Sequence, residues 1–417
     1  MNMKKYGCIG KKLTHSFSKE IHSKLADYDY RLIELDEDEL KVFFKEKDFC
    51  AINVTIPYKQ AVIEYLDSLS DVAKRIGAVN TIVNKNGKLY GYNTDYYGMK
   101  ALVEKTGVEI EGKKVLVLGT GGTSKTARVL AEDLGAAEIL IVSRNKTEDY
   151  ITYGEAVKEY NNAQVIINTT PSGMYPDCES EPIDISEFKN LEGVLDAVYN
   201  PLRTNLILKA KEKGIKAEGG LYMLVMQAVE AVKKFLDTEI EKTVANSVFE
   251  SVILSKENIV LTGMPGSGKS TVGKLLDIEG FSFVDTDEEI EKRCGCSIKE
   301  LIKTKGEKYF RDMETEVIKD ISSKSSQVIS TGGGAVLREE NVTALKRNGK
   351  IFFINANLNR LSPTTNRPLG DTWEKLRELY YERINIYKAT ADFIVPDMET
   401  PKEEAEFILK TIMELRI

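Results

Sequence analysis

The chain has 417 residues, of which 42% are hydrophobic and 29% charged, a composition that excludes a disordered or fibrous protein. Its 58 Lys and Arg residues against 65 Asp and Glu residues leave a net charge of −7, which disfavours nucleic acids and membrane surfaces as partners. We see no run of ~20 apolar residues, no signal-peptide pattern and no disulfide framework among the five cysteines. We therefore expect a cytoplasmic protein.

Residues 1–95 alternate short strands and helices, as in KYGCIG, KEIHSKLADY, YRLIEL, DELKVFFKEK and CAINVTIP, which predicts an α/β lobe. Hydroxyls, amides, one amine and one carboxylate follow these segments and suit a small polyhydroxylated acid as ligand. They are Ser16, Ser18, Asn53, Thr55, Lys59, Asn80, Asn93 and Asp95. Lys59 with Asp95 nearby could supply the proton that ketone reduction requires. The alternative is a surface lysine and a turn aspartate.

Residues 115–135, VLVLGTGGTSKTARVLAEDLG, follow the strand, glycine loop and helix order of a dinucleotide-binding fold. Gly119 permits the tight turn and Gly121 lets the backbone approach a pyrophosphate, while Ser124 replaces the third glycine. The next strand ends in Arg144 without an acid, which favours NADP over NAD unless Arg144 is an ordinary surface residue. We assign 96–220 to this Rossmann-like lobe, and 221–255 to C-terminal helices and a short joint.

Residues 258–276, NIVLTGMPGSGKSTVGKLL, match the phosphate-binding loop G-x-x-x-x-G-K-[ST] between a strand and a helix. This pattern predicts a P-loop α/β domain with a parallel sheet over 256–417, which would bind a nucleotide. The candidate nucleotide-binding residues are Gly263, Gly266, Gly268, Lys269, Ser270 and Thr271. Lys269 would neutralise phosphate charge and Ser270 would bind Mg²⁺.

The rest of this domain suggests an acidic acceptor. Asp285 and Asp287 stand two apart at the end of a segment predicted to be a strand, so both carboxylates could face one site, one serving the metal and the other a substrate hydroxyl. The alternative is an acidic helix N-terminus. Three separate segments each carry one arginine: Arg311, Arg367 and Arg383. Arginines in such places suit a carboxylate substrate and a phosphoryl transition state. The segment TTNRPLG, which contains Arg367, resembles a lid.

Seven segments of the first half occur in the order found in shikimate dehydrogenases: THSFS, NVTIPYK, GAVNT, GYNTDYYG, GTGGTS, NTTPSGM and GGLYMLVMQA. The chain thus resembles this two-lobed α/β family over residues 1–250, which implies reduction of 3-dehydroshikimate with NADPH. The resemblance implies a catalytic pair, Lys59 and Asp95, and substrate contacts from Ser16, Ser18, Thr55, Asn80 and Gln227. It implies cofactor contacts from Gly119, Gly121, Gly122, Arg144, Thr169, Met174, Tyr199 and Gly220. The stretch between Arg144 and NTTPSGM is shorter than is usual in the family, so we expect one trimmed helix there.

The second half, from Asn258 onward, resembles shikimate kinases. The resemblance implies that shikimate is bound by Asp287, Arg311, Gly333 and Arg383. It implies Mg²⁺ at Ser270 and Asp285, action of Lys269 and Arg367 on the transferring phosphate of ATP, and stacking of Arg360 on adenine. Gly370 departs from the usual end of the lid motif.

We therefore expect a bifunctional enzyme, α/β throughout, that makes shikimate and phosphorylates it, with small-molecule substrates as its partners. Two alternatives stay open. One half could be a non-catalytic metabolite sensor, or the dehydrogenase half could act on quinate with NAD. The oligomeric state does not follow from the sequence.

Overall fold

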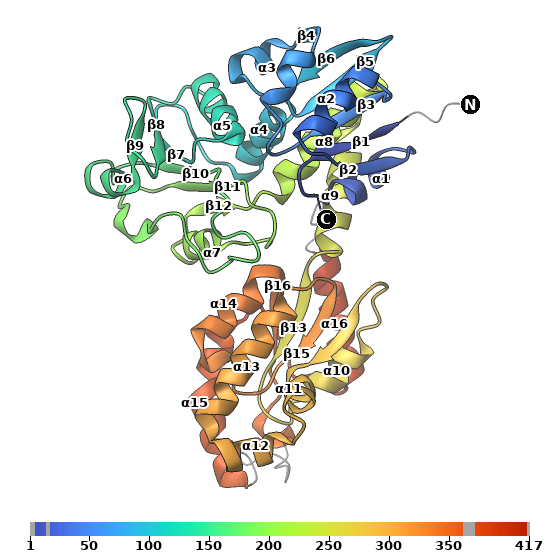
Figure 1. Ribbon diagram of the computed structural model, residues 1–417. Coiled ribbons are helices and arrows are strands. Elements are labelled where there is room, and N and C mark those ends of the chain that lie inside the picture. The colour runs from blue at the N-terminus through green and yellow to red at the C-terminus, as the bar shows by residue number, and fades with distance from the viewer. Residues whose placement is uncertain (1–4, 14–16, 362–371, 415–417) are drawn as a thin grey trace. The chain divides into compact units, whose positions relative to one another are not determined.

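The structure is a computed structural model that describes residues 5–13, 17–361 and 372–414. The chain divides into two compact units, Met1–Val252 and Ile253–Ile417, which are described separately below. Within those described ranges, none of the helices combines the length and the apolar character that a membrane crossing requires. Each of the three sheets lies beside helices, so the chain is α/β throughout the described residues (Figure 1).

The N-terminal unit begins with a mixed six-stranded sheet in the order β2-β1-β3-β5-β6-β4. Its strands are β1 (Tyr6–Gly10), β2 (Tyr30–Glu34), β3 (Ala51–Val54), β4 (Ser68–Leu69), β5 (Thr81–Lys85) and β6 (Lys88–Tyr92). Strands β5 and β6 form a hairpin whose two-residue turn is Asn86-Gly87, with φ of 56° and 83°. Asn-Gly is the pair that such a turn favours, because both positions need positive φ.

Successive residues of this sheet face two different cores, as strand alternation requires. Ile52 packs with residues of α2 (Glu37–Glu46), α3 (Asp71–Ile76) and the 3-10 turn η1 (Ala61–Tyr65). Ala51 packs on the opposite side with Phe235 of α8 (Leu221–Leu236), and α1 (Ser18–Leu25) also contacts α8. The first lobe is therefore covered on one face by a helix from far along the chain.

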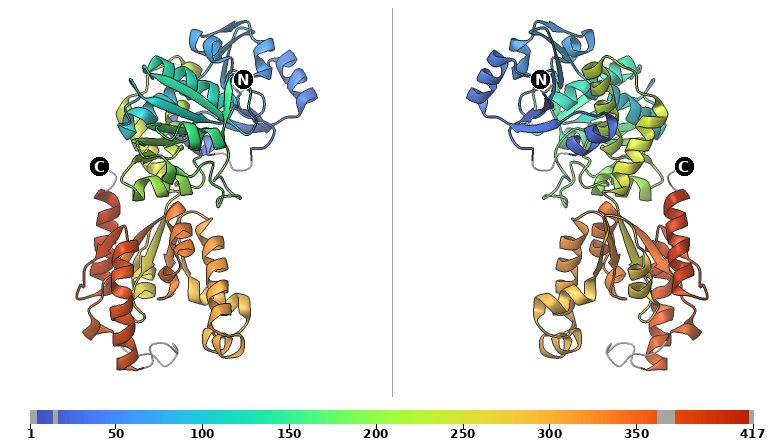
Figure 2. Two further views of the ribbon diagram at one scale, coloured as in Figure 1. Left: turned by 90° about the vertical axis from the view of Figure 1, so that its left-hand side faces the viewer. Right: turned by 90° about the vertical axis from the view of Figure 1, so that its right-hand side faces the viewer.

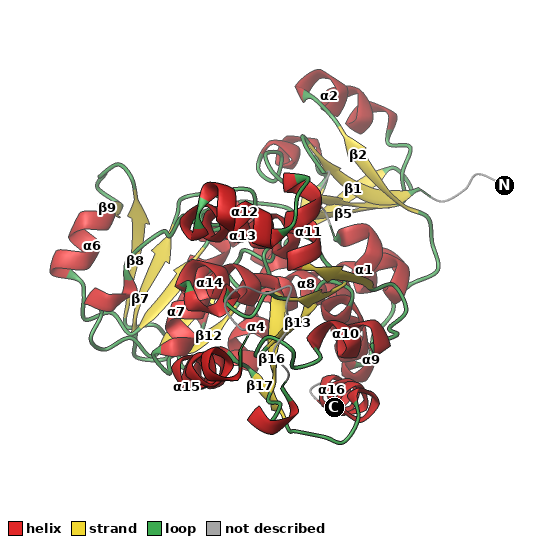
Figure 3. Cartoon of the chain, turned by 90° about the horizontal axis from the view of Figure 1, so that it is seen from below, coloured by secondary structure: helices red, strands yellow, loops and turns green. Residues whose placement is uncertain are grey.

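The second sheet of this unit is entirely parallel, in the order β12-β11-β10-β7-β8-β9. Figure 3 shows its strands β9, β8 and β7 side by side. Its strands are β7 (Lys114–Leu118), β8 (Glu138–Ser143), β9 (Tyr150–Thr152), β10 (Val165–Asn168), β11 (Gly193–Asp196) and β12 (Lys216–Glu218). The strand order reverses at β7, which has β8 on one side and β10 on the other. Such a switch point is where doubly wound sheets bind ligands.

Helices cover both faces of the parallel sheet. One core joins Val117 to α4 (Asp95–Thr106), α5 (Gly122–Asp133) and α8, and the other joins Leu116 to α6 (Tyr153–Glu159), α7 (Asn205–Glu212) and the 3-10 turn η2 (Ile185–Glu187). Helix α8 therefore packs on both sheets of the unit. Helix α9 (Lys242–Leu254) follows it and returns toward α1, where Lys24 Nζ donates to Ser251 Oγ at 2.9 Å.

The C-terminal unit holds a parallel five-stranded sheet in the order β14-β15-β13-β16-β17. Its strands are β13 (Asn258–Thr262), β14 (Ser282–Asp285), β15 (Gln327–Ser330), β16 (Gly349–Ile354) and β17 (Phe393–Val395). Its helices are α10 (Lys269–Leu275), α11 (Thr286–Cys294), α12 (Ile298–Lys305), α13 (Glu307–Ser322), α14 (Glu339–Asn348), α15 (Trp373–Thr390) and α16 (Pro401–Glu414), with 3-10 turns η3 (Ala335–Leu337) and η4 (Leu358–Arg360).

Helices lie on both sides of this sheet as well (Figure 2). Ile259 and Leu261 pack under α10 and α16, whereas Val260 between them packs with α11 to α15. This alternation buries β13 on both faces, as expected for the central strand of a parallel sheet. The loop after β13 is thereby held at the carboxyl edge of the sheet.

Candidate active sites

Lys59 and Asp95 form an ion pair in the N-terminal unit. Lys59 lies in the turn after β3, and Asp95 is the first residue of α4. The Lys59 Nζ donates to Asp95 Oδ2 at 2.6 Å, and the two side chains are only 16% and 10% exposed. The structure thus brings together two residues that are 36 positions apart in the sequence.

Asn80 connects this pair to the rest of the predicted substrate residues. Its Nδ2 donates to Asp95 Oδ1 at 2.9 Å and to Thr94 Oγ1 at 3.0 Å, and its Oδ1 accepts from the Thr94 backbone N–H at 2.7 Å. The Thr94 hydroxyl in turn donates to Gln227 Oε1 of α8 at 3.3 Å. Sequence reasoning passed over Thr94, although its place in the GYNTDYYG motif beside Asp95 was a signal.

The remaining predicted substrate residues lie on neighbouring segments. Thr55 directly follows β3 and its backbone N–H donates to Ile9 O at 3.0 Å. Ser18 is the first residue of α1. Ser16 lies outside the described residues. Asn53, beneath Asn80, is buried and donates to the Asn80 carbonyl at 3.3 Å.

The glycine loop after β7 borders the same pair. Gly119 has a φ of +105°, which favours glycine. A Cβ on Gly122 would lie 3.7 Å from Lys59 Cδ, so the start of α5 adjoins the lysine. A Cβ on Gly121 would meet open space, and the first turn of α5 carries no acidic residue. A bare, acid-free helix start of this kind fits the pyrophosphate of a dinucleotide.

Arg144 stands exposed just past the end of β8, where a cofactor ribose would be read. The segment that follows forms β9 and then α6, a helix of only seven residues. Thr152 caps α6, and Glu155 completes the capping box and pairs with Lys146. Hydrogen bonding from Lys146 and Thr152 lowers the pKa of Glu155 to about 2.

Four further predicted cofactor residues occupy the loops beyond the sheet. Thr169 Oγ1 donates to the Leu118 carbonyl at 2.6 Å, and a Cβ on Gly119 would lie 3.0 Å from this hydroxyl. Met174 is 43% exposed, and the Tyr199 ring lies 5.2 Å from that of Phe17. Gly220 caps α8 where a Cβ would overlap the Ala197 carbonyl.

The phosphate-binding loop of the C-terminal unit has the backbone that its sequence demands. Gly266 and Gly268 have φ of 80° and 88°, and Gly263 has a φ of 150°. Lys269 is buried, and its Nζ donates to the carbonyls of Gly263 and Met264 at 2.9 Å each. The amine is therefore held inside the loop, where phosphate oxygens would lie.

Hydroxyl and carboxylate oxygens gather beside this loop. Ser270 Oγ donates to Asp285 Oδ2 at 2.7 Å and lies 3.2 Å from Ser330 Oγ. Such hard oxygen donors suit Mg²⁺. Thr271 follows Ser270 in α10.

The strand argument for Asp285 and Asp287 is wrong, because α11 begins at Thr286 between them. Asp285 caps this helix through the backbone N–H groups of Asp287 and Glu288. The Asp287 carboxylate instead approaches Gly332, where a Cβ would lie 2.6 Å from its Oδ1. The two carboxylates therefore serve different neighbours, and the acidic helix start that was left open as an alternative is present.

The three glycines after β15 are surrounded by charged side chains. A Cβ on Gly332 would also lie 2.9 Å from Glu314 Oε1, and one on Gly334 would collide with the Arg311 guanidinium. Arg311 Nη1 donates to Glu314 Oε2 at 2.8 Å. Burial raises the pKa of Glu314, an effect that Arg311 opposes. Glu314 stands one helical turn after Arg311 in α13.

Arg383 of α15 reaches the same glycines. It is buried, and its Nη1 donates to the Gly333 carbonyl at 3.2 Å. Arg360, at the end of η4, pairs with Asp397 at 2.5 Å. Arg367 and Gly370 lie outside the described residues.

Comparisons with known proteins identify the families to which the two parts of the chain are similar. The family model described as "Shikimate dehydrogenase substrate binding domain" matches residues 8–82, and the model described as "Shikimate kinase" matches residues 265–413. A shikimate dehydrogenase (NADP(+)) of Clostridium perfringens is 40% identical over 268 residues, which are 60% of this chain and 98% of that protein. A shikimate dehydrogenase (NADP(+)) of Caldicellulosiruptor bescii is 39% identical over 261 residues, which are 56% of this chain and 90% of that protein.

Solved structures give the same result for the N-terminal part. A chorismate mutase/shikimate 5-dehydrogenase fusion protein from Clostridium acetobutylicum is 34% identical, with a TM-score of 0.57 over 60% of this chain and 98% of that one. Shikimate 5-dehydrogenase from Thermus thermophilus, solved with NADP(H) and shikimate, is 26% identical with a TM-score of 0.54, over 60% and 99%. The chain is thus an oxidoreductase joined to a kinase, and it belongs to the shikimate dehydrogenase family, to which it adds a shikimate kinase domain.

Proposed function

We propose that this bifunctional enzyme of the shikimate pathway reduces 3-dehydroshikimate to shikimate with NADPH and then phosphorylates the shikimate 3-hydroxyl with ATP and Mg²⁺. Its partners are these small molecules. The observation that carries the proposal is the Lys59–Asp95 pair at 2.6 Å beside the glycine loop, in a chain that also holds a phosphate-binding loop. We assign the substrate lobe to 1–95, the NADP lobe to 96–220 and the kinase to 256–417.

In the first site, Lys59 acts as the general acid. Its ammonium group is oriented by Asp95, which is itself fixed by Asn80. Bound NADPH would supply the hydride to the carbonyl carbon. Lys59 would then donate a proton to the carbonyl oxygen, so that no free alkoxide forms. Asn80, Thr94 and Gln227 present amide and hydroxyl groups to the ring hydroxyls.

The groups around the first site fit NADP. Gly121 and Gly122 leave space for the pyrophosphate at the start of α5. Arg144 is exposed at the end of β8, and its planar guanidinium suits a ribose 2′-phosphate. The relatives in the comparison are named for NADP(+) as well.

In the second site, catalysis is by positioning and charge neutralisation. Mg²⁺, when bound there, would offset the charge of the ATP phosphates. Ser270 and Asp285 would hold the ion, and Lys269 would turn from the loop carbonyls to the phosphate oxygens. Arg311 and Arg383 would take the shikimate carboxylate, and Asp287 a ring hydroxyl, while Arg367 would act on the transferring phosphate.

Product analysis by mass spectrometry tests both activities in one chain. The purified protein is incubated with 3-dehydroshikimate and NADPH, with and without ATP and Mg²⁺. We expect shikimate without ATP and shikimate 3-phosphate with it. No shikimate in either tube would refute the dehydrogenase assignment, and shikimate that stays unphosphorylated would confine the failure to the kinase. Parallel incubations of quinate with NAD⁺ and of shikimate with NADP⁺ test the quinate alternative by the reverse reaction.

A further inference from the structure

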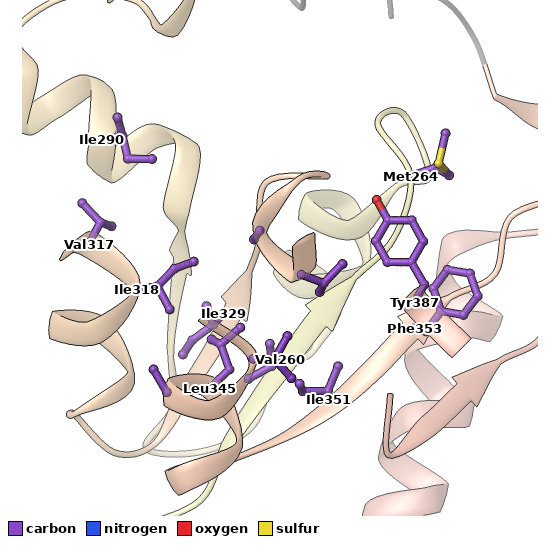
Figure 4. Packing of buried hydrophobic residues seen from close by; sticks show 14 of the residues in the cluster. Val260, Met264, Ile290, Val317, Ile318, Ile329, Leu345, Ile351, Phe353 and Tyr387 are labelled. Carbon is purple, nitrogen blue, oxygen red and sulfur yellow. The ribbon is translucent and has the colours of Figure 1, made fainter. Parts of the chain in front are cut away.

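Tyr387 is a fully buried tyrosine whose hydroxyl no part of the proposed reactions uses. It lies on α15, one helical turn after Arg383, and is 0% exposed. Its ring stacks on that of Phe353 with centroids 5.1 Å apart and an interplanar angle of 11°. Figure 4 shows the two rings side by side, with the Tyr387 hydroxyl oxygen directed away from Phe353.

A buried hydroxyl costs stability unless it is hydrogen-bonded, so a purely apolar core would favour phenylalanine here. The Tyr387 hydroxyl has such a bond, because it donates to the carbonyl of Gly333. Burial raises the pKa of Tyr387 to about 12, although the nearby Arg383 acts in the opposite direction. The hydroxyl therefore remains a proton donor at every pH at which the enzyme would work.

The Gly333 carbonyl is the point where two side chains of one helix meet. It accepts from Tyr387 and, at 3.2 Å, from Arg383 Nη1. A Cβ on Gly333 would lie 2.8 Å from Pro265 of the phosphate-binding loop, so the glycine sits directly against that loop. Gly334, the next residue, adjoins Arg311. A shift of this carbonyl would move the acceptor of Arg383 and the glycine turn that adjoins Arg311.

We propose that Tyr387 is a positioning residue of the shikimate site, whose hydroxyl fixes the Gly333 carbonyl and through it the placement of Arg383 and the glycine turn. Tyr387 itself does not touch the substrate. The Gly333 carbonyl accepts from both side chains, so the tyrosine hydroxyl helps to fix the acceptor to which Arg383 Nη1 donates. The inference rests on the proposed kinase function, since it assigns Gly333 and Arg383 to shikimate.

Tyr387→Phe in the full chain tests this role, because it removes one oxygen and keeps the ring on Phe353. One hydrogen bond is lost, so we expect the KM for shikimate to rise about three- to tenfold. The KM for MgATP and the kcat should stay within about twofold, since Lys269 and its loop contacts are untouched. Calorimetric titration with shikimate should show the same loss in affinity.

Two variants separate positioning from packing. Tyr381→Phe removes a hydroxyl from the same helix at a side chain that is 66% exposed, and should leave all constants unchanged. Phe353→Leu removes the stacked ring but keeps the Tyr387 hydroxyl, so it should lower stability to urea without raising the shikimate KM. The NADPH-dependent activity of each variant reports the state of the other unit.

An unchanged shikimate KM in Tyr387→Phe, with a wild type that phosphorylates shikimate, would overturn this inference alone. The same holds if the KM values for shikimate and MgATP rise together, or if Phe353→Leu raises the shikimate KM as much as Tyr387→Phe does. Should Tyr387→Phe fail to fold, an elevated shikimate KM in Phe353→Leu would overturn the inference and a normal one would support it. A wild type that does not phosphorylate shikimate would refute the kinase function, and the inference with it.

Discussion

Replacing Lys59 by methionine removes the proposed general acid while keeping a side chain of similar length. Proton donation by a positioned group contributes about 10²–10⁴ to a rate, so we expect kcat for ketone reduction to fall by that factor. This corresponds to about 2.7–5.4 kcal/mol of lost transition-state stabilisation. We expect a loss in the upper part of this range, because the Lys59–Asp95 ion pair is short and its two side chains are only 16% and 10% exposed.

Asp95→Asn perturbs the same pair from the other side. Both Asp95 oxygens accept hydrogen bonds, from Lys59 at 2.6 Å and from Asn80 at 2.9 Å. An asparagine would turn an NH₂ group toward one of these donors, so the ammonium or the amide would lose its partner. We expect a loss similar to that of Lys59→Met. Because the two residues act as one unit, the double variant should be no more than about tenfold worse than the poorer single variant.

The assay follows NADPH oxidation with 3-dehydroshikimate at saturation for the wild type, both single variants and the double variant. Kinase turnover of each preparation normalises for the amount of active chain, since the kinase residues lie in the other unit. Lys74→Met is the matched lysine control, because its pair with Asp71 is exposed. A Lys59→Met enzyme within tenfold of wild type, or losses that multiply in the double variant, would refute the reasoning.

Three further outcomes follow from single residues. Burial raises the pKa of Asp196 from 3.8 to about 6, so its contribution to stability is complete below pH 4 and about 3 kcal/mol of it is lost as the pH rises to 6. In Asp196→Asn, the free energy of unfolding of the N-terminal unit in urea should therefore vary less with pH across this window, and an unchanged pH dependence would contradict the argument. Gly332→Ala would place a methyl group against Asp287 and Glu314, so in steady-state kinetics the KM for shikimate should rise about tenfold while the KM for MgATP stays unchanged. Equal rises in the two KM values would count against the assignment of Asp287 to the shikimate site. Lys269→Met should lower phosphorylation about 10²–10³-fold with reduction intact, and retained kinase turnover in a coupled assay would disprove its role.

Much of the architecture could be predicted from the sequence where a motif fixes the local backbone. The loops after β7 and β13 were recognisable because Gly119 and Gly268 need positive φ, and glycine is the residue that adopts it. The strand–loop–helix order around each loop then implies a parallel sheet. Lys59 and Asp95 could be named from their motifs, but only the fold shows that they meet.

The parts that could not be predicted depend on distant contacts. The strand argument for Asp287 fails because a helix starts at Thr286, a boundary that alternation alone cannot locate. Thr94 gains its place from Asn80 and Gln227, the second of which is 133 residues away. Tyr387 gives no sequence signal beyond its spacing of four from Arg383, since its partner is a backbone carbonyl.

Helix α8 has a consequence for the order in which the enzyme is completed during synthesis. The N-terminal sheet ends at Tyr92 and α8 begins at Leu221, so 128 residues separate the sheet from the helix that covers it. At about 5–20 residues per second, a ribosome needs about 6–26 s to make this stretch. During that time Tyr6 and Ala51 face water instead of α8. The N-terminal lobe is therefore synthesised first but is covered only after α8 has been made. A translational pause before α8 would prolong the exposure of its apolar sheet.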